Sequence, residues 1–237
     1  MKGLILAAGF GTRLGKLTEN KPKVLVEVGG TAILNHNIRK LLNAGISEII
    51  INTHYLSQQV EDFLSRQPYR NLVMTVHEDE LLGTAGTVSG NWDWFNNEDF
   101  LVMHGDNYFE ADLDTLLAKH ANRHPQAEMT MATFTASNPT SCGTVEVDAN
   151  DVVTHFYEKD PFSHSLRANA AIYIFSPYLY ETFRSLSKEE NDLSRHVVPK
   201  LLGKIQAHHL YGDFFDIGTA EGLQAASQSY LSHQEYL

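Results

Sequence analysis

The chain begins with Met1-Lys-Gly-Leu-Ile-Leu-Ala-Ala-Gly-Phe-Gly-Thr-Arg-Leu-Gly-Lys-Leu-Thr-Glu-Asn-Lys-Pro-Lys-Val-Leu25, and this stretch decides the fold class. The apolar run Leu4–Ala8 predicts a buried strand that breaks directly into the small-residue turn 9–12. Because glycine has no Cβ, the backbone N–H groups of such a turn can approach a phosphate, and nearby cations neutralise it. Arg13 follows the turn, and Lys23 lies a short distance further on. The segment is therefore predicted to be a phosphate-binding loop at the start of an α/β domain.

Two better-known phosphate-binding motifs do not match this loop. A P-loop needs two glycines five residues apart, with Lys and then Ser or Thr after the second, and Gly15-Lys16 lacks both the partner glycine and the hydroxyl. A dinucleotide-binding fingerprint needs a third small residue where this chain has Leu14. The alternative that the segment is only a turn does not account for Arg13 and Lys23.

The pattern that remains is Leu-Ala-Ala-Gly-x-Gly-Thr-Arg-Leu over residues 6–14, followed by Pro22-Lys23. It resembles the signature of the sugar-1-phosphate nucleotidyltransferases, also called NDP-sugar pyrophosphorylases. The resemblance extends over essentially the whole chain and implies the short form of the family, because no hexapeptide repeat of a β-helical tail follows residue 220. A single nucleotidyltransferase domain over 1–237 is expected, with a nucleotide-binding half at 1–106 and a sugar-phosphate-binding half at 107–237.

Length, composition and charge agree with one α/β domain. The 237 residues suffice for a substantial core, and the hydrophobic (43%) and charged (20%) contents are ordinary for a globular protein. The net charge of −11 argues against a nucleic acid as partner, because nucleic-acid-binding proteins carry a basic face. No apolar stretch has the length of a membrane span, and the N-terminus lacks a signal-peptide pattern, so no membrane partner is expected. The single Cys142 fits a reducing cytoplasm, the histidines show no zinc pattern, and monomer or homo-oligomer stays open.

The fold class predicted is α/β, with a Rossmann-like, doubly wound and mostly parallel sheet. In the first half, apolar runs alternate with helical spacing of apolar residues, which is typical of parallel strands joined by helices. Gly45 is expected to cap one helix at its C-terminus, and Ser57 to cap the next at its N-terminus. The predicted elements are strands at 4–8, 48–52, 72–76 and 99–103, and helices at 33–43 and 57–66.

The second half changes character and predicts a mixed-sheet lobe. The resemblance implies that this lobe binds the sugar, as in GT-A-like nucleotidyltransferases. Short strand patterns follow one another with turns between them, Asn150-Asp151 among those turns, before helical patterns return. The predicted elements are strands at 129–135, 143–147, 152–157 and 168–175, and helices at 177–186 and 193–202.

Two aspartates are candidate metal ligands. When a sugar 1-phosphate attacks a nucleoside triphosphate, several negative charges crowd together, so catalysis needs positioning, cations and a bridging divalent metal. Magnesium takes oxygen ligands and often only one or two protein carboxylates. Asp106 follows Gly105 after an apolar strand, and Asp216 precedes a Gly-Thr turn. A turn or helix cap is the alternative for each; the resemblance implies that the two together hold Mg²⁺.

The resemblance also assigns the cations and the sugar side. It implies that Arg13 grips the triphosphate and that Lys23 binds phosphate near the reacting centre, which makes Arg13, Lys23 and Asp106 the catalytic residues. Glu158-Lys159 matches the family's E-K-P, with Asp160 in place of the proline, and would contact the sugar and its phosphate. Asn169 lies in a segment that resembles the family's N-A-G-I-Y, whose Asn contacts the sugar. Ala171 replaces the glycine of this motif, and its methyl group leaves less space at that point.

The base is expected to meet the N-terminal loop and one side chain before the Leu-Gly-Thr-Ala-Gly turn at 82–86. Glu78 is the candidate, and because a carboxylate only accepts hydrogen bonds it pairs naturally with the N–H groups of guanine. This favours GTP over UTP or dTTP. The predicted nucleotide-binding residues are Leu6, Ala7, Ala8, Gly9, Gly11, Thr12, Arg13, Lys23, Glu78, Gly83, Thr84 and Asp106; the predicted sugar-phosphate-binding residues are Gly83, Asn107, Gly143, Glu158, Lys159 and Asn169.

The function expected is transfer of a nucleoside monophosphate from an NTP to a sugar 1-phosphate, by direct displacement and with release of pyrophosphate. The sequence shows no Ser-His or Cys-His pattern that would indicate a covalent enzyme intermediate. Two alternatives stay open: a cytidylyltransferase acting on an alditol or choline phosphate, and a catalytically silent paralogue that binds a nucleotide sugar. The presence of every expected charged residue argues against the silent paralogue.

Overall fold

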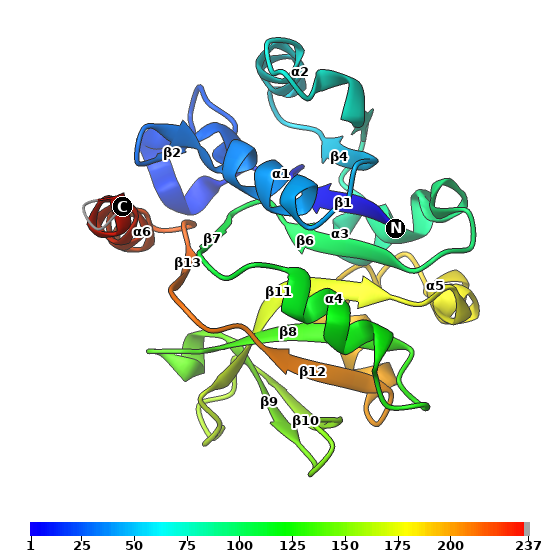
Figure 1. The fold of residues 1–237 in the computed structure, drawn as a ribbon. Helices are drawn as coiled ribbons and strands as arrows, with labels where there is room; N and C mark the ends of the chain where they lie inside the picture. Colours follow the sequence, from blue (N-terminus) through cyan, green and yellow to red (C-terminus); the bar gives the residue numbers. More distant parts are fainter. Residues whose placement is uncertain (235–237) are drawn as a thin grey trace. The chain divides into compact units, whose positions relative to one another are not determined.

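The computed structural model describes residues 1–234, which form two compact units (Figure 1). The first, here called the loop unit, contains residues 3–81 and 103–112 and the described residues from Gly212 onward. The second, the strand unit, contains residues 1–2, 82–102 and 113–211. These bounds describe packing and differ from a division at residue 106, because the chain returns to the loop unit near its C-terminal end.

The loop unit is built on a parallel sheet. Strands β1 (Lys2–Leu6), β4 (Ile49–Thr53) and β5 (Val73–His77) lie in the order β1-β4-β5, and β6 (Phe100–His104) adds its last residues beside β1. Leu4 lies opposite Ile50 and Ile5 opposite Ile51, so the apolar runs of β1 and β4 form the buried middle of the sheet. All four strands were predicted, each within two residues.

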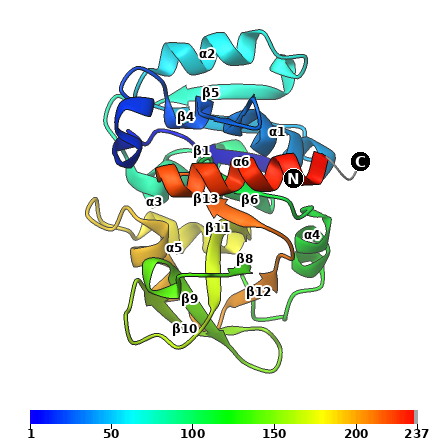
Figure 2. The same cartoon turned by 90° about the vertical axis from the view of Figure 1, so that its left-hand side faces the viewer.

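Two helices of the loop unit show which sequence signals specify its connections. In α1 (Ile33–Asn43), Ile33, Leu34, Ile38 and Leu41 are buried, and the predicted bounds are confirmed. The helix ends as predicted at Gly45, whose φ of +78° lets its N–H bond to Leu42 O (3.0 Å). The helix α2 (Ser57–Ser65) lies alongside β5 (Figure 2). Its predicted cap is wrong: Leu56, in a left-handed conformation, precedes the helix, and no side chain caps it.

Short elements complete the loop unit. Residues 12–17 and 23–25 form 3-10 turns, and Glu27–Val28 (β2) pairs with Thr31–Ala32 (β3) around two glycines of positive φ. Residues 70–72 form another 3-10 turn. Strand β7 (Asn107–Phe109) pairs with β13 (Phe214–Asp216) in antiparallel fashion, and α6 (Ala220–Gln234) follows β13.

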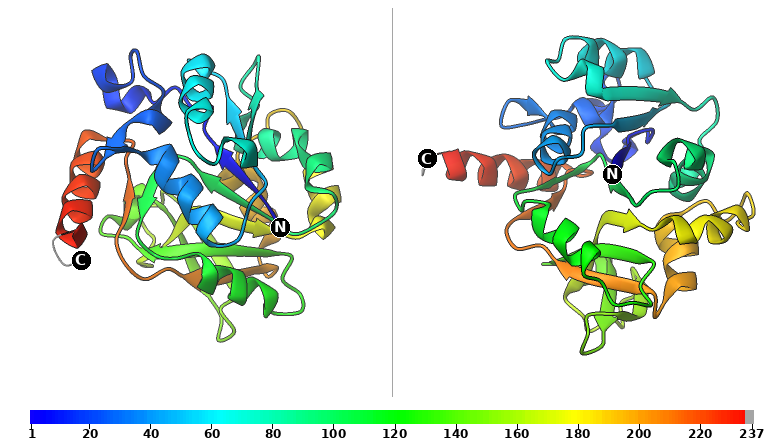
Figure 3. Two further views of the ribbon diagram at one scale, coloured as in Figure 1. Left: turned by 45° about the horizontal axis from the view of Figure 1, so that its top comes forward. Right: turned by 45° about the vertical axis from the view of Figure 1, so that its right-hand side comes forward.

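The strand unit contains the predicted mixed sheet, in the order β12-β8-β11-β9-β10. Only β12 runs parallel to its neighbour, β8; the other pairs are antiparallel. The helix α4 lies against β8 and β12 (Figure 3, right). The bounds are β8 (Met129–Thr135), β9 (Gly143–Val147), β10 (Val153–Glu158), β11 (Arg167–Phe175), β12 (Ile205–His209), α3 (Gly83–Gly90), α4 (Asp114–Ala121) and α5 (Tyr180–Arg184), with 3-10 turns at 92–95, 139–141, 177–179 and 198–201.

One predicted helix of the strand unit is irregular. Residues 193–202 form a single π turn at 193–197 and a 3-10 turn at 198–201. Pro199 lacks the N–H that a continued α-helix needs at this position, which accounts for the change in hydrogen-bonding pattern. Within residues 1–234, no helix has both the length and the apolar character that crossing a bilayer requires.

Candidate active site

The two predicted metal aspartates are brought together by the pairing of β7 with β13. Asp216 lies opposite Asn107 in this pair, and the N–H of Ile217 bonds to the carbonyl oxygen of Asp106 (3.1 Å). The start of α6 packs closely against the same strand: a Cβ on Gly222 would lie 2.0 Å from Asp216 O. Residues far apart in the chain thus become neighbours through backbone hydrogen bonds. These bonds fix the backbone positions of Asp106 and Asp216, from which the two carboxylate side chains extend.

Lys23 lies between the two carboxylates. Its ammonium forms an ion pair with Asp106 and lies 3.7 Å from Oδ1 of Asp216, and its side chain is only 8% exposed. Arg13 reaches Asp216 from the other side, with 3.4 Å between Nη1 and Oδ2, and is well exposed. The structure therefore brings Arg13, Lys23, Asp106 and Asp216 together in one cluster of the loop unit, as predicted for a site that handles phosphate.

Electrostatics keep Asp106 ionised. Burial by itself would raise the pKa of this carboxyl group, but the ammonium of Lys23, and to a smaller extent His104, lower it by more. The net result is a pKa below the usual range, so Asp106 is a carboxylate at neutral pH. A carboxylate held in this state can give up its ion pair with Lys23 and bind a metal ion instead. It can also keep the ion pair and orient the ammonium of Lys23 toward a ligand.

Glycines allow the cluster to be this compact. A Cβ on Gly218 would lie 2.7 Å from Oδ1 of Asp216 and 2.8 Å from both Arg13 Nη2 and Lys23 Nζ. The N–H of Gly218 bonds to the same Oδ1 (2.7 Å), which holds the carboxylate in place. Gly11 has a φ of +68°, and its missing Cβ leaves room for the stem of Lys23. The Gly-rich loop therefore positions the lysine as well as presenting N–H groups.

Replacing Gly11 with alanine is expected to lower the free energy of unfolding by about 2–4 kcal/mol, from a left-handed backbone and a clash with Lys23. The new Cβ would lie 2.9 Å from that of Lys23. Two other glycines give controls: Gly45 has a similar φ of +78° but open space, and Gly9 has neither constraint. Denaturant unfolding should show the largest loss of stability for Gly11→Ala, a smaller loss for Gly45→Ala and the smallest for Gly9→Ala; equal losses at Gly11 and Gly45 would exclude the contact with Lys23.

Glu78, the residue predicted to contact the nucleotide base, lies at the end of a chain of hydrogen bonds that starts in the Gly-rich loop. The N–H of Ala7 bonds to Oδ1 of Asn52 (2.7 Å), and Nδ2 of Asn52 donates to Oε1 of Glu78 (2.9 Å). Glu78 is buried, and its backbone N–H bonds to Thr53 O. Asn52 was not predicted, although its place at the end of a strand beside β1 is the signal that could have identified it. The remaining loop residues Leu6, Ala8, Gly9 and Thr12 lie in the same unit.

The donor set of the cluster fits magnesium held jointly with a phosphate. No group of three or more His, Cys, Asp or Glu side chains within residues 1–234 could hold a metal ion alone. Two carboxylates around a buried ammonium, with a glycine leaving space beside them, match the way Mg²⁺ is bound in phosphate-transfer sites, where substrate oxygens and water complete its coordination. Asp106 and Asp216 therefore suit a metal that arrives with its nucleotide.

A second group of predicted residues gathers in the strand unit. Glu158 lies opposite Gly143 in the β9–β10 pair, and a Cβ on Gly143 would lie 2.8 Å from Oε2 of Glu158. Burial raises the pKa of Glu158, and Lys159 offsets part of this effect. Lys159 has a left-handed backbone with φ +53°, and its N–H bonds to Cys142 O (3.1 Å). Glu158 at the end of β10 thus supplies an acidic side chain. Lys159, in the turn that follows, supplies a basic side chain from a backbone conformation that is unusual for a residue other than glycine.

Asn169 and Thr84 are tied to one short segment at 191–194. Nδ2 of Asn169 donates to Tyr173 Oη (2.7 Å) and to Ser194 Oγ (3.3 Å). The hydroxyl of Thr84 accepts from the N–H of Leu193 (2.8 Å), and a Cβ on Gly83 would lie 2.5 Å from Asn191 O. The segment 191–194 was not predicted to take part, and no motif in the sequence marks it. Asn107, predicted for the sugar side, lies in the loop unit instead.

Replacing Ala171 with glycine is expected to stabilise the protein by up to about 1 kcal/mol, because it relieves a left-handed backbone at the cost of some chain entropy. Ala171 has a φ of +53°, and its N–H bonds to Oδ1 of Asn169 (2.9 Å). The neighbouring Ala170, buried and without positive φ, gives the control, and its glycine variant should lose roughly 0.5–1 kcal/mol. Denaturant midpoints that move in the same direction for both variants would rule out strain at residue 171.

The protein has an α/β fold, and its cluster combines two cations with two carboxylates, a combination that phosphate-transfer sites use. The family model described as nucleotidyl transferase matches residues 2–233, and the chain belongs to this family. It is 31% identical over 238 residues to the mannose-1-phosphate guanylyltransferase catalytic subunit beta of Danio rerio, covering 98% of this chain and 65% of that protein. The corresponding protein of Dictyostelium discoideum is 29% identical with the same coverage. The chain thus spans 65% of the length of both relatives.

Two solved structures share the fold. A Bacillus anthracis protein assigned as a glucose-1-phosphate thymidylyltransferase, in complex with a sucrose, has a TM-score of 0.86 at 24% identity and covers 96% of this chain and 94% of its own. HddC from Yersinia pseudotuberculosis, complexed with GMP-PN, has a TM-score of 0.79 at 23% identity and covers 97% and 99%. The predicted fold class is confirmed by these similarities and by the sheets described above.

Proposed function

We propose that this protein transfers a nucleoside monophosphate from an NTP to a sugar 1-phosphate and releases pyrophosphate. The observation that carries the proposal is the cluster in which Lys23 lies between Asp106 and Asp216, beside a Gly-rich loop that supplies Arg13. Membership in the nucleotidyl transferase family supports it. Such a cluster combines the cations and carboxylates that phosphate transfer requires.

The reaction is a direct displacement. An oxygen of the sugar 1-phosphate attacks the α-phosphorus of the NTP, the bond to the bridging oxygen breaks, and pyrophosphate leaves with the electron pair. Lys23 and Arg13 neutralise the charge on the triphosphate and orient it for in-line attack. Asp106 and Asp216 would hold Mg²⁺, which supplies further positive charge to the phosphates. No protein nucleophile is needed, because the acceptor is itself a nucleophilic oxygen.

The two groups of residues divide the substrates between them. In the loop unit, the residues from Leu6 to Arg13 together with Lys23 and Glu78 bind the nucleotide. In the strand unit, Glu158 contacts the sugar, and Lys159 and Asn169 contact the sugar or its phosphate. Gly83 and Thr84 contribute backbone to both substrates, while Gly143 leaves room for Glu158 and Asn107 meets the sugar phosphate.

GTP is the nucleotide that we propose. The carboxylate of Glu78 accepts hydrogen bonds only, and it is oriented by Asn52, so it suits the N1–H and N2–H₂ groups of guanine. The relatives named above as mannose-1-phosphate guanylyltransferases support the same choice and make mannose 1-phosphate the first acceptor to test. We place the reaction in the cytoplasm, where a chain with a single cysteine and a need for nucleoside triphosphates fits.

Pyrophosphate release with Mg²⁺ tests the proposal. GTP, UTP, dTTP, CTP and ATP are each combined with a panel of hexose and heptose 1-phosphates, and with choline and alditol phosphates. Release that requires one NTP and one sugar 1-phosphate supports the proposed class and identifies both substrates. Release with CTP and a non-sugar phosphate alone would instead favour a cytidylyltransferase, and nucleotide binding without any release would favour a silent paralogue.

A further inference from the structure

The strand unit contains an open cavity of about 490 Å³ that none of the residues proposed for the reaction lines. It lies where the ends of β8, β11 and β12 meet the turn after β9, and its lining includes Thr135, Asp151, Leu166, Arg167, His209 and Tyr211. All of these residues belong to the strand unit. The cavity is large enough for a small organic ligand.

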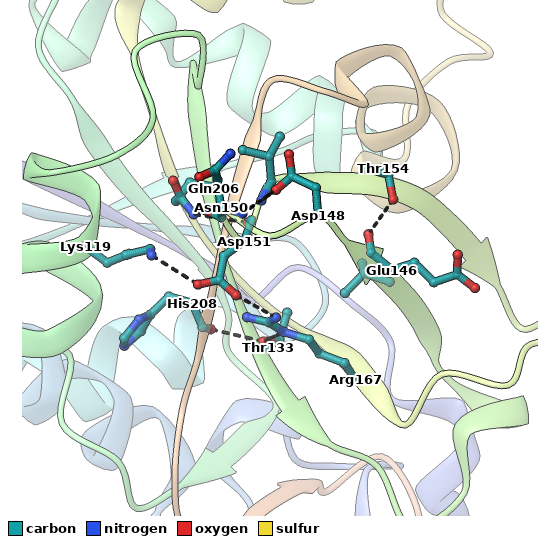
Figure 4. A network of polar contacts seen from close by, with 12 residues as sticks. Lys119, Thr133, Glu146, Asp148, Asn150, Asp151, Thr154, Arg167, Gln206 and His208 are labelled. Carbon is teal, nitrogen blue, oxygen red and sulfur yellow. Dashed lines mark hydrogen bonds and ion pairs between the residues drawn. The ribbon is translucent and has the colours of Figure 1, made fainter.

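Arg167 is held rigidly at this cavity. Its Nε donates to Thr133 Oγ1 (3.0 Å) and its Nη1 to Asp151 Oδ1 (3.1 Å), and the side chain is only 22% exposed (Figure 4). The hydrogen bonds among residues 1–234 leave Nη2 without a partner. A guanidinium that is held at two of its nitrogens and open at the third is pre-organised to donate to an oxyanion through that nitrogen, since little side-chain entropy remains to be lost.

The charge around Arg167 is positive although the chain as a whole is acidic. Asp151 accepts from both Lys119 (3.2 Å) and Arg167, so one carboxylate faces two cations (Figure 4). Burial would raise the pKa of Asp151, but the hydrogen bonds from Arg167 and Lys119 lower it by more, which keeps it charged. Three side chains therefore carry a net charge of about +1 in a chain of net charge −11.

The neighbouring side chains add neutral donors and apolar walls. Burial lowers the pKa of His209, and Arg167 lowers it further, so that near neutral pH its imidazole is an uncharged donor or acceptor. His208 behaves similarly, through burial and then Lys119. Thr135 adds a hydroxyl. Tyr211, 81% exposed, packs edge-on against His209 with 5.0 Å between ring centroids, and Leu166 is 56% exposed.

We propose that this cavity is a binding site for a small phosphate monoester that carries a ring. Nη2 of Arg167 donates to the phosphate, and the ring lies against Tyr211 and Leu166. Thr135 and His209, whose Oγ1 and Nε2 lie 3.4 Å apart, complete the hydrogen bonds of the phosphate. The contacts of the ring with Tyr211 and Leu166 make the ester bind more tightly than inorganic phosphate. The site is independent of the reaction proposed above and would remain if that reaction were a different one.

Nuclear magnetic resonance of the whole chain tests the site, with inorganic phosphate and phenyl phosphate as probes. The Nε–Hε resonance of Arg167 should shift saturably with both, and phenyl phosphate should bind about 2- to 12-fold more tightly, as expected for one aromatic contact. Because the signal belongs to Arg167, binding of either probe to the nucleotide loop does not interfere. No saturable shift of this resonance at millimolar probe would overturn the proposal.

Variants separate the two parts of the site. Tyr211→Ala removes a highly exposed side chain. Phenyl phosphate should then bind no more tightly than inorganic phosphate, and the affinity for inorganic phosphate should stay unchanged. Arg167→Lys keeps the charge but loses the guanidinium geometry, and should weaken the binding of both probes at least about 10-fold, the scale of one charge-assisted hydrogen bond. Binding to this variant is followed by the backbone amide resonance of Tyr211, so that binding at the nucleotide loop does not interfere. Arg184→Ala, in the same unit and outside the cavity lining, is the control. Equal losses in Arg184→Ala, or an unchanged preference in Tyr211→Ala, would contradict the assignment.

Discussion

Replacing Lys23 with alanine is expected to lower kcat by at least about 10²–10³-fold, the usual cost of losing one group that stabilises charge in the transition state. The side chain is buried between Asp106 and Asp216, whereas Arg13, the other cation of the cluster, is exposed and pairs with Asp216 alone. Removal of Lys23 also leaves Asp106 facing burial without its ammonium partner, and the pKa of Asp106 should then rise. Steady-state pyrophosphate release with saturating substrates measures the effect.

Lys21→Ala is the matched control for this variant. Lys21 lies two positions away in the same loop, but its side chain is 43% exposed and pairs with Glu27 (3.0 Å). Its loss should change kcat by less than about fivefold, because an exposed ion pair contributes less than about 1 kcal/mol. A Lys23→Ala enzyme with unchanged kcat and only a raised KM would show that Lys23 binds substrate without stabilising the transition state.

Replacing Asp106 with asparagine is expected to lower Mg²⁺-dependent turnover by about 10³-fold or more, since a catalytic metal stabilises the transition state by several kcal/mol. Asparagine has nearly the same shape and can still accept from Lys23, so the fold should stay intact. A titration of activity against Mg²⁺, together with circular dichroism and denaturant unfolding, separates loss of the metal from loss of structure.

Asp112→Asn serves as the control. Asp112 lies in the same unit, its side chain is 79% exposed, and it pairs with Lys40 at 3.4 Å. Its variant should keep the Mg²⁺ dependence of the unmodified protein. Substantial residual activity in Asp106→Asn, with an unchanged requirement for Mg²⁺, would exclude Asp106 as a metal ligand.

Most elements of the fold could be predicted because each has a local cause. The spacing of Ile33, Leu34, Ile38 and Leu41 predicts α1, and Gly45 predicts where it ends. Features that depend on tertiary packing were not predicted correctly. The left-handed Leu56, rather than a capping serine, precedes α2. The segment after residue 193 takes π and 3-10 turns that helical spacing alone does not reveal.

The charged members of the candidate site could be predicted, but the contacts that orient them could not. Asp106 and Asp216 lie in motifs that mark them individually, whereas their adjacency depends on the pairing of β7 with β13 across a long separation in the chain. Asn52 carries no motif, and its contacts with Ala7 and Glu78 emerge only from the parallel registers of β4 with β1 and with β5. Departures from a motif were informative: Ala171 adopts the backbone conformation that favours glycine.

Phosphorus-31 magnetic resonance of a reaction containing the protein, Mg²⁺, GTP and mannose 1-phosphate tests the direct transfer of a nucleotide to a sugar phosphate. The resonances of pyrophosphate and of a sugar nucleotide should appear together in equal amounts, and neither should appear when the sugar 1-phosphate is left out. If GTP gives no product, the NTP and sugar identified by the substrate panel replace this pair. Pyrophosphate released without a sugar phosphate, or accompanied by free GMP or by nucleotide bound covalently to the protein, would contradict direct displacement.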